Sequence, residues 1–307
     1  MTQMVKIKHF TAMALASVLA GTAYGEPLIV ESFESGDMSA TNEAGFDWGR
    51  NNRTSVVTAD AVVYNNGEKN VAKPSGRDWD PKHGEHSLRF RYASGSYMAE
   101  QRFNLGQAYP ELWLQYWVKV PINYYHGQNS PSNHKFLALW MDGYSQKGDG
   151  ASVIWEFWGS DDGSSRLAYH FSKGGYQITG GHIGHQEFIN VPEDLGRWME
   201  ITVHVKASSM GNSPDGVIQL WRRWENELPS QRELMHDRTD AVLPLPATGP
   251  QGWKSGYFMG WANAAYAKDT EWLVDYITFS TETLLGTEAL IGSNSNAPNP
   301  PTLTLEN

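Results

Sequence analysis

Hydrophobic and polar residues alternate in short segments along most of the chain. Between Glu111 and Val120 the even-numbered positions are Leu, Tyr and Val, whereas the odd-numbered positions are Trp, Gln and Lys. The segment Met199–Lys206 alternates in the same way, with Met, Ile and Val at the odd positions. A period of two is typical of β-strands that bury one face, so both segments are predicted strands.

Similar segments follow one another at short intervals, separated by turns rich in Gly, Pro, Asn and Asp. Further strands are expected near residues 27–34, 54–64, 85–92, 97–105, 134–142, 152–158, 166–172, 217–224 and 257–263. No helical periodicity extends beyond two or three turns, and a short helical turn is expected near Ser230–Met235. No internal repeat is visible. The pattern predicts an all-β fold, an antiparallel β-sandwich of the jelly-roll type in one domain.

The segment Glu271–Phe279 is apolar on both of its alternating faces, which predicts a strand in the middle of a sheet. Asp275 is the exception in this row. Together with Glu31 or Glu34 from the first strand, its carboxylate could bind calcium, because hard oxygen ligands suit that ion and first and last strands often pair. The alternative is that Asp275 accepts hydrogen bonds from loop amides.

The two ends of the chain differ from the body. Lys6 and Lys8 precede the apolar run Phe10–Ala20, and Ala23-Tyr24-Gly25 offers small residues for cleavage, which is the pattern of a signal peptide. That run is too short for a membrane span. The sequence therefore predicts a signal peptide at 1–25, a β-sandwich domain at 26–282, a low-complexity tail at 283–307, and a secreted or periplasmic protein.

Composition narrows the function. The chain has 307 residues, 40% of them hydrophobic, with 13 Trp and 14 Tyr, which is more aromatic surface than a core needs and suits sugar binding. A net charge of −10 argues against a nucleic-acid partner, which requires a basic surface. Cysteine is absent, so disulfides and thiolate sites are excluded. We expect a monomer.

Common catalytic motifs are also absent from the sequence. There is no HExxH, Walker A or GxSxG motif, and no strand carries the ExDxxE carboxylates of sandwich-shaped retaining glycosidases. Glu156 stands alone in its strand. His182 and His185 have a spacing that can hold zinc, yet the local sequence supplies no third ligand, so we expect a loop with two solvated histidines.

Another reaction that suits this shape is β-elimination on uronic acids, which needs a partner for the substrate carboxylate, a base and an acid. Glu100 and Arg102 share one face of their predicted strand, and His134 shares a face with Trp140. Tyr257 and Asn263 share a face in the next-to-last strand, and Tyr266 follows in the loop.

These segments resemble the concanavalin A-like jelly-roll polysaccharide lyases, which include alginate, glucuronan and heparin lyases. Glu100-Gln101-Arg102 corresponds to the RSEL strand of the family 7 alginate lyases, and Asn133-His134-Lys135 to their QIH. Tyr257 to Asn263 corresponds to YFKAGxYNQ, although Met259 stands where the family has Lys. The resemblance implies that Arg102 and His134 bind the carboxylate and that Tyr257 or Tyr266 is the acid or base.

We therefore expect a secreted lyase that cleaves an acidic, uronate-containing polysaccharide. A second string, Tyr169–Gln177, is similar to the Tyr-containing motif and adds His170 and Tyr176 as candidates. The alternatives are a lectin-like binding module and a glycoside hydrolase of the same fold. The expected substrate-binding residues are Glu100, Trp113, Trp117, Lys135, Trp140, His170, Trp261 and Asn263.

Each candidate also has a purely structural interpretation. Arg102 and Glu100 could form a surface ion pair of little energetic value. Tyr257 could belong to the core, and Trp113 and Trp117 could pack beneath a loop instead of stacking on a sugar.

Overall fold

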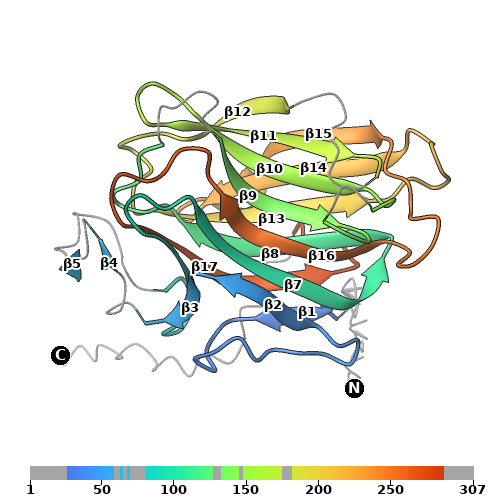
Figure 1. Cartoon of the computed structure of the whole chain (residues 1–307), viewed down its shortest axis with the longest axis horizontal. Helices are drawn as coiled ribbons and strands as arrows, with labels where there is room; N and C mark the ends of the chain where they lie inside the picture. Colours follow the sequence, from blue (N-terminus) through green and yellow to red (C-terminus); the bar gives the residue numbers. More distant parts are fainter. Residues whose placement is uncertain are drawn as a thin grey trace, which may run out of the picture.

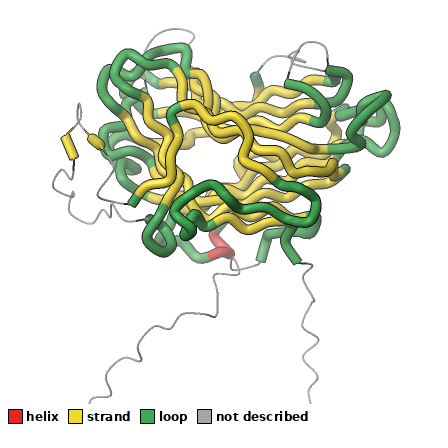
Figure 2. Tube along the Cα trace, turned by 60° about the horizontal axis from the view of Figure 1, so that its bottom comes forward, coloured by secondary structure: helices red, strands yellow, loops and turns green. Residues whose placement is uncertain are grey.

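The computed structural model describes residues 26–58, 63–64, 68–69, 81–126, 133–144, 148–174 and 182–286. Two antiparallel β-sheets lie one against the other and form the body of the protein (Figure 1). Loops connect the strands at both ends of the sandwich (Figure 2). The predicted signal peptide and most of the predicted tail lie outside the described residues.

One sheet has eight strands. In spatial order they are β15 (Glu233–Ala241), β14 (Gly216–Trp224), β13 (Trp198–Lys206), β8 (Glu111–Lys119), β17 (Thr270–Ser280), β6 (Ser87–Tyr92) and β3 (Thr54–Val57), with β1 (Ile29–Glu31) paired to β17. The segment predicted to be a central strand is β17, and it lies between β8 and β6 as expected.

The other sheet has seven strands. In order they are β12 (Ile183–Ile189), β11 (Ser165–Ser172), β10 (Ser152–Gly159), β9 (Asn133–Trp140), β16 (Trp253–Trp261), β7 (Met98–Tyr109) and β2 (Asp47–Asn52). A small hairpin, β4 (Val63–Tyr64) and β5 (Glu68–Lys69), is separate from both sheets.

Apolar side chains from the facing sides of the two sheets form one large core. The even-numbered residues of β8, from Leu112 to Val118, lie in it, while Trp117 belongs to a separate cluster on the outer side. The antiparallel β-sandwich predicted from the alternation is therefore confirmed. The described helical structure is a 3₁₀ turn at Pro229–Gln231, and no described helix has the length and apolar character of a membrane span.

Three strands of the two large sheets occur where the alternation predicted no strand. They are β2, β12 and β15, and each is the last strand at an edge of its sheet. An edge strand has one neighbour and exposes polar side chains, so its sequence does not show clear alternation. The turn predicted near Ser230–Met235 ends at Gln231, and β15 begins at Glu233.

A β-bulge in β9 changes which side chains face the core. Leu137 pairs with Trp155 and Lys135 pairs with Glu156, so Phe136 is an extra residue in the ladder. Phe136 and Leu137 therefore both lie in the core. One consequence is that His134 does not share a face with Trp140, contrary to the prediction from simple alternation.

Candidate functional site

The outer face of the seven-stranded sheet carries a row of side chains that crosses five strands. Tyr257 on β16 is directly opposite Arg102 on β7 and Ala138 on β9. Ala138 is opposite Ile154 on β10, which in turn is opposite His170 on β11. The residues that follow these five in each strand lie in the core, so the row faces away from it.

The first polar group on this face, here called the Arg102 cluster, consists of Glu100, Arg102, Trp140, Tyr144 and Tyr257. The Arg102 Nε lies 2.7 Å from Glu100 Oε1. The guanidinium carbon is 5.9 Å from the Trp140 ring centre and 5.6 Å from that of Tyr144. The hydroxyl groups of Tyr144 and Tyr257 are 3.1 Å apart and share a hydrogen bond. A cation and two phenols therefore meet over an indole ring.

The second group, here called the Glu156 cluster, consists of Asn133, Lys135, Glu156, His170 and His182. Glu156 Oε1 lies 3.0 Å from Lys135 Nζ and 3.6 Å from His170 Nε2. Glu156 Oε2 lies 2.7 Å from His182 Nε2 and accepts a hydrogen bond from the Asn133 amide. The carboxylate is thus the centre of four nitrogen-bearing side chains.

The charge of Glu156 is fixed by these neighbours. Burial raises its pKa, but contacts with His170 and His182 and the charge of Lys135 act in the opposite direction and hold the pKa below its usual range. Glu156 is therefore an ionised carboxylate although its side chain is only 1% exposed.

Gly260 is the point where the two clusters meet. A Cβ atom placed on Gly260 would lie 3.2 Å from both Lys135 Cβ and Tyr257 Cε2. The φ angle of Gly260 is +147°, a backbone conformation that residues other than glycine rarely adopt. The missing side chain leaves Lys135 and Tyr257 as neighbours on the outer face. Met259, at the position where the resembling lyases have Lys, lies in the core.

Six of the predicted site residues meet on this face: Glu100, Arg102, Lys135, Trp140, His170 and Tyr257. Trp261 and Asn263 lie farther along the same connection. Trp261 is 47% exposed, stacks on Tyr97 with ring centres 5.2 Å apart, and donates its indole N–H to Asn263. Tyr176 lies outside the described residues.

His134 and Tyr266, by contrast, lie on the core side of the sheet. His134 Nε2 is 2.6 Å from the Tyr92 hydroxyl, and Nδ1 is 2.8 Å from the Tyr266 hydroxyl. Phe157 and Trp272 surround the imidazole ring. Burial, followed by the charge of His126, lowers the pKa of His134 well below 6.5. The β9 bulge turns His134 inward, so neither His134 nor Tyr266 lies on the face of the Arg102 cluster, and their role in catalysis stays a prediction.

Trp113 and Trp117 lie on the opposite side of the molecule, on the outer face of the eight-stranded sheet. Trp113 stacks on His204 with ring centres 4.0 Å apart. Trp117 contacts Lys82 and Arg223 through its ring. These two residues are therefore separated from the Arg102 cluster by the full sandwich, and the prediction that they line the same substrate site is corrected.

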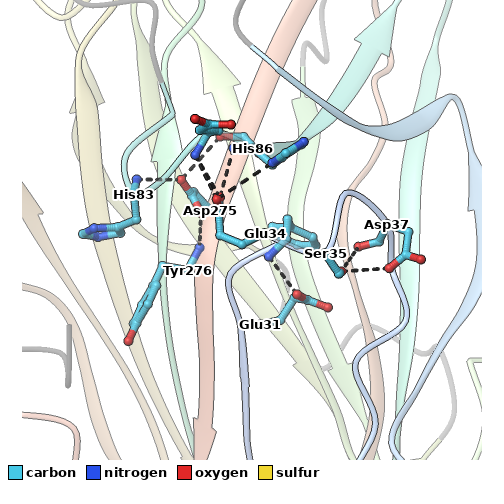
Figure 3. A network of polar contacts seen from close by, with 11 residues as sticks. Glu31, Glu34, Ser35, Asp37, His83, His86, Asp275 and Tyr276 are labelled. Atoms are coloured by element: carbon cyan, nitrogen blue, oxygen red, sulfur yellow. Dashed lines mark hydrogen bonds and ion pairs between the residues drawn. The ribbon is translucent and has the colours of Figure 1, made fainter. Parts of the chain in front are cut away.

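The three acids of the predicted calcium site accept backbone N–H groups (Figure 3). Glu31 accepts from Phe33, Glu34 from Glu85 and His86, and Asp275 from His83 and Tyr276. Burial raises the pKa of Asp275 to about 7, and the charge of Glu34 adds to this effect. The two backbone amides at Asp275 match the alternative interpretation, in which this carboxylate accepts hydrogen bonds from loop amides.

Glu156, His170 and His182 could together hold a metal ion, because their ligand atoms lie within 4.8 Å of one another. Within the described ranges, no other three His, Cys, Asp or Glu residues form such a set. The sequence interpretation treated Glu156 as isolated and His182 as part of a loop, and it omitted Tyr144. A carboxylate inside the apolar strand Val153–Trp158 was the available signal, because such a charge requires partners. His182, the residue before β12, supplies one.

No family profile matches the sequence, and neither does any curated protein. Solved structures do match. An alginate lyase Aly36B double variant in complex with alginate tetrasaccharide is 12% identical over 74% of this chain and 96% of its own, with a TM-score of 0.45. The alginate lyase vAL-1 from Chlorella virus is 10% identical over 78% and 94%, with a TM-score of 0.43.

A sugar-bound protein also matches. The exoplasmic/lumenal domain of VIP36, in a form bound to Ca²⁺ and Man3GlcNAc, is 11% identical over 66% of this chain and 81% of its own, with a TM-score of 0.38. The matched structures thus include both lyases and a sugar-bound lumenal domain. Any function for this chain must therefore come from its own side chains.

Proposed function

We propose that the protein is a polysaccharide lyase that cleaves an acidic, uronate-containing polymer on the outer face of the seven-stranded sheet. The observation that carries the proposal is the cross-strand pair of Arg102 and Tyr257, with Lys135 beside Tyr257 across Gly260. One small area thus offers two cations and a phenol.

This combination suits β-elimination. A base takes the proton from the carbon next to the uronate carboxylate, and the electron pair forms a carbon–carbon double bond. The glycosidic C–O bond at the adjacent carbon breaks, and the leaving oxygen takes up a proton. The carboxylate opposes the first step because negative charge accumulates next to it, so a cation at the carboxylate lowers the barrier.

The residues divide between these roles. Arg102 binds the carboxylate, since a guanidinium presents a planar pair of donors to two oxygens. Lys135 on β9 adds positive charge. It supplies the lysine that is missing at Met259, where the alginate lyases of family 7 have one. Tyr257 is fully buried, so it transfers the proton by way of the partly exposed Tyr144 hydroxyl, its hydrogen-bonded partner. The Arg102–Glu100 ion pair keeps the guanidinium in place until substrate binds.

The signal-peptide pattern at the N-terminus supports an extracellular substrate. Residues 1–25 have the pattern of a signal peptide, and a polymer of uronates is found outside cells or in their walls. We infer a secreted or periplasmic enzyme that acts as a monomer. Gel filtration and mass determination of the exported protein test both points.

The test is a panel of alginate, glucuronan, ulvan and heparin-type polymers, incubated with the exported protein. Ultraviolet absorbance from unsaturated uronate ends should rise on at least one polymer. Arg102→Ala should lower this rate by about 100-fold, within the range for loss of one charge-stabilising donor. If no polymer gives unsaturated ends, the proposed function is wrong.

Arg238→Ala is the matched control. Arg238 Nε lies 3.1 Å from Asp240, two residues along β15, just as Arg102 is paired with Glu100, but β15 belongs to the other sheet. Its activity should equal that of the wild type. An equal loss in both variants would mean that Arg102 acts through stability alone.

A non-catalytic sugar-binding module is the second candidate, favoured by the exposed Tyr97–Trp261 stack. Sugar rings pack on such exposed aromatic faces. Binding of a polymer without unsaturated ends or new reducing ends would select this function. New reducing ends without unsaturation would indicate a hydrolase instead.

A further inference from the structure

We propose that Glu156, His170 and His182 form a binding site for a divalent transition-metal ion of the Zn²⁺ type. The proposal is independent of lyase activity, because the ion can bind whether or not this face cleaves a polymer. Two imidazoles and one carboxylate are a ligand set that zinc uses in sites with an open fourth position.

Strand pairing brings the three ligands together. Ile154 on β10 is opposite His170 on β11, so Glu156 is the diagonal neighbour of His170 on the same face. Tyr169 is opposite Ile183, and the next step of this antiparallel ladder places His182 beside His170. Two adjacent strands therefore contribute Glu156 and His170, and His182 directly precedes the third strand, β12. Ligands on paired strands are held more rigidly than ligands on loops.

The donor atoms have distances close to those a metal requires. Zinc–ligand bonds of about 2.0–2.2 Å in a tetrahedron separate neighbouring donors by roughly 3.3 Å. The Glu156 Oε1–His170 Nε2 distance is 3.6 Å, and the Glu156 Oε2–His182 Nε2 distance is 2.7 Å. Each histidine thus faces a different oxygen of the same carboxylate, and one donor atom from each of the three residues lies within 4.8 Å of the other two. An ion between the histidines requires both Glu156–histidine contacts to change by roughly half an ångström, in opposite directions.

The surroundings fix the ligands without filling the site with apolar groups. Trp158 contacts the His182 ring edge-on at 4.7 Å between ring centres, and the His170 and His182 rings are 4.8 Å apart. The Nε2 atoms of both histidines are buried and turned toward Glu156. Such fixed imidazoles bind metal with little loss of side-chain entropy.

Lys135 is the competitor for the same carboxylate. Its ammonium lies 3.0 Å from Glu156 Oε1, and the Asn133 amide also donates to Glu156. An ion that binds must displace the Lys135 ammonium from Oε1, so affinity is lower than in a site without a cation. Lys135→Met should therefore tighten metal binding.

The experiment measures zinc content and affinity in tag-free protein after treatment with a chelator. Calorimetry with ZnCl₂ should show one ion per chain, and Co²⁺ should give visible absorption bands typical of four or five ligands. His182→Ala and Glu156→Gln should each weaken Zn²⁺ binding by about tenfold or more. Lys135→Met should bind Zn²⁺ more tightly than the wild type.

His185→Ala is the matched control, because His185 is three residues from His182 but does not belong to the ligand set. Its affinity should stay within about twofold of the wild type. His182 is the more exposed ligand, with 20% of its side chain accessible, so this variant is expected to fold even if Glu156→Gln does not. A wild-type protein without zinc affinity, or equal losses in His182→Ala and His185→Ala, would overturn the proposal.

Discussion

Histidine and tyrosine side chains lie on both faces of the seven-stranded sheet, and the two sets differ in what surrounds them. On the core side, His134 lies between the hydroxyls of Tyr92 and Tyr266. On the outer side, Tyr257 faces Arg102 and His170 faces Glu156. The inner set has neutral partners and rings around it, whereas the outer set has charged partners.

This difference separates structural from chemical use of the same residue types. A neutral imidazole satisfies the inner set completely if Nε2–H donates to Tyr92 and Nδ1 accepts from Tyr266. Proton transfer there would create a buried, unpaired charge. In the outer set, Lys135 and Arg102 supply charges that a substrate or an ion can exchange for its own.

Removing one hydroxyl from each set gives the largest expected contrast in turnover. Tyr257→Phe should lower the rate of formation of unsaturated ends by about 100-fold or more, because it removes the proton-transfer group. Tyr92→Phe makes the same change on the core side and should leave this rate within about threefold while it costs roughly 1–3 kcal/mol of stability. Steady-state assays and urea unfolding measure both. The opposite result would reverse the assignment of the two faces.

Truncation of the inner histidine should have the next largest effect, this time on stability. His134→Ala should lower the free energy of unfolding by about 3–5 kcal/mol, since it leaves a cavity and two tyrosine hydroxyls without their partner. Urea unfolding measures this loss. His185→Ala, on the exposed edge strand β12, should cost less than about 1 kcal/mol. A loss below that value for His134→Ala would contradict the buried network.

The inner histidine also predicts a pH dependence of stability. The pKa of His134 is well below 6.5 in the folded protein, whereas the unfolded chain takes up a proton at its ordinary pKa. Its contribution is therefore fully present above about pH 6.5 and is lost as the pH falls, by about 2 kcal/mol between roughly pH 8 and pH 5.

Comparison with His134→Gln isolates the pH-dependent contribution of His134 to stability, since glutamine cannot take up the proton. Urea unfolding at each pH should show that wild-type stability falls by about 2 kcal/mol more than that of the variant. Parallel curves for the two proteins would mean that His134 titrates normally in the folded state.

The smallest effect should come from the tryptophans of the two sheets. Trp140→Ala, next to Arg102, should raise KM by about three- to tenfold, which corresponds to one aromatic contact. Trp113→Ala, on the eight-stranded sheet, should leave KM and kcat within about twofold. Kinetics on the best polymer of the panel measure both. An equal rise in KM for Trp113→Ala would place substrate on both outer faces.

Alternation in the sequence predicts the fold well because most strands bury one complete face. The strands β8 and β13 show it, and the alternating side chains of β8 divide between core and outer face as predicted. Edge strands were missed, since β12 and β15 are polar and lack a second neighbour. The candidate site was predicted in part. Arg102 and Tyr257 lie where β7 and β16 pair without a register shift, so simple alternation along the sequence gives the correct face for both.

The rest of the candidate site depends on backbone irregularities and strand register, which alternation along the sequence does not reveal. The bulge at Phe136 reverses the faces of His134 and Lys135, and Met259, with φ of +57°, turns into the core before Gly260. The Glu156 cluster joins β9, β10 and β11 with His182, which directly precedes β12 in a segment that was expected to be a loop. Its members span 49 positions in the chain, from Asn133 to His182, yet only the strand register brings them together.

The length of β9 has a consequence for how this protein can vary. Deletion of one residue at the bulge would restore regular pairing and exchange the sides of the two residues before it. A lysine would then enter the core and a histidine would leave it. The deletion would therefore remove both the buried histidine–tyrosine hydrogen bonds and the lysine–glutamate ion pair of the outer face. Surface loops of the sandwich can gain or lose residues freely, but this strand cannot.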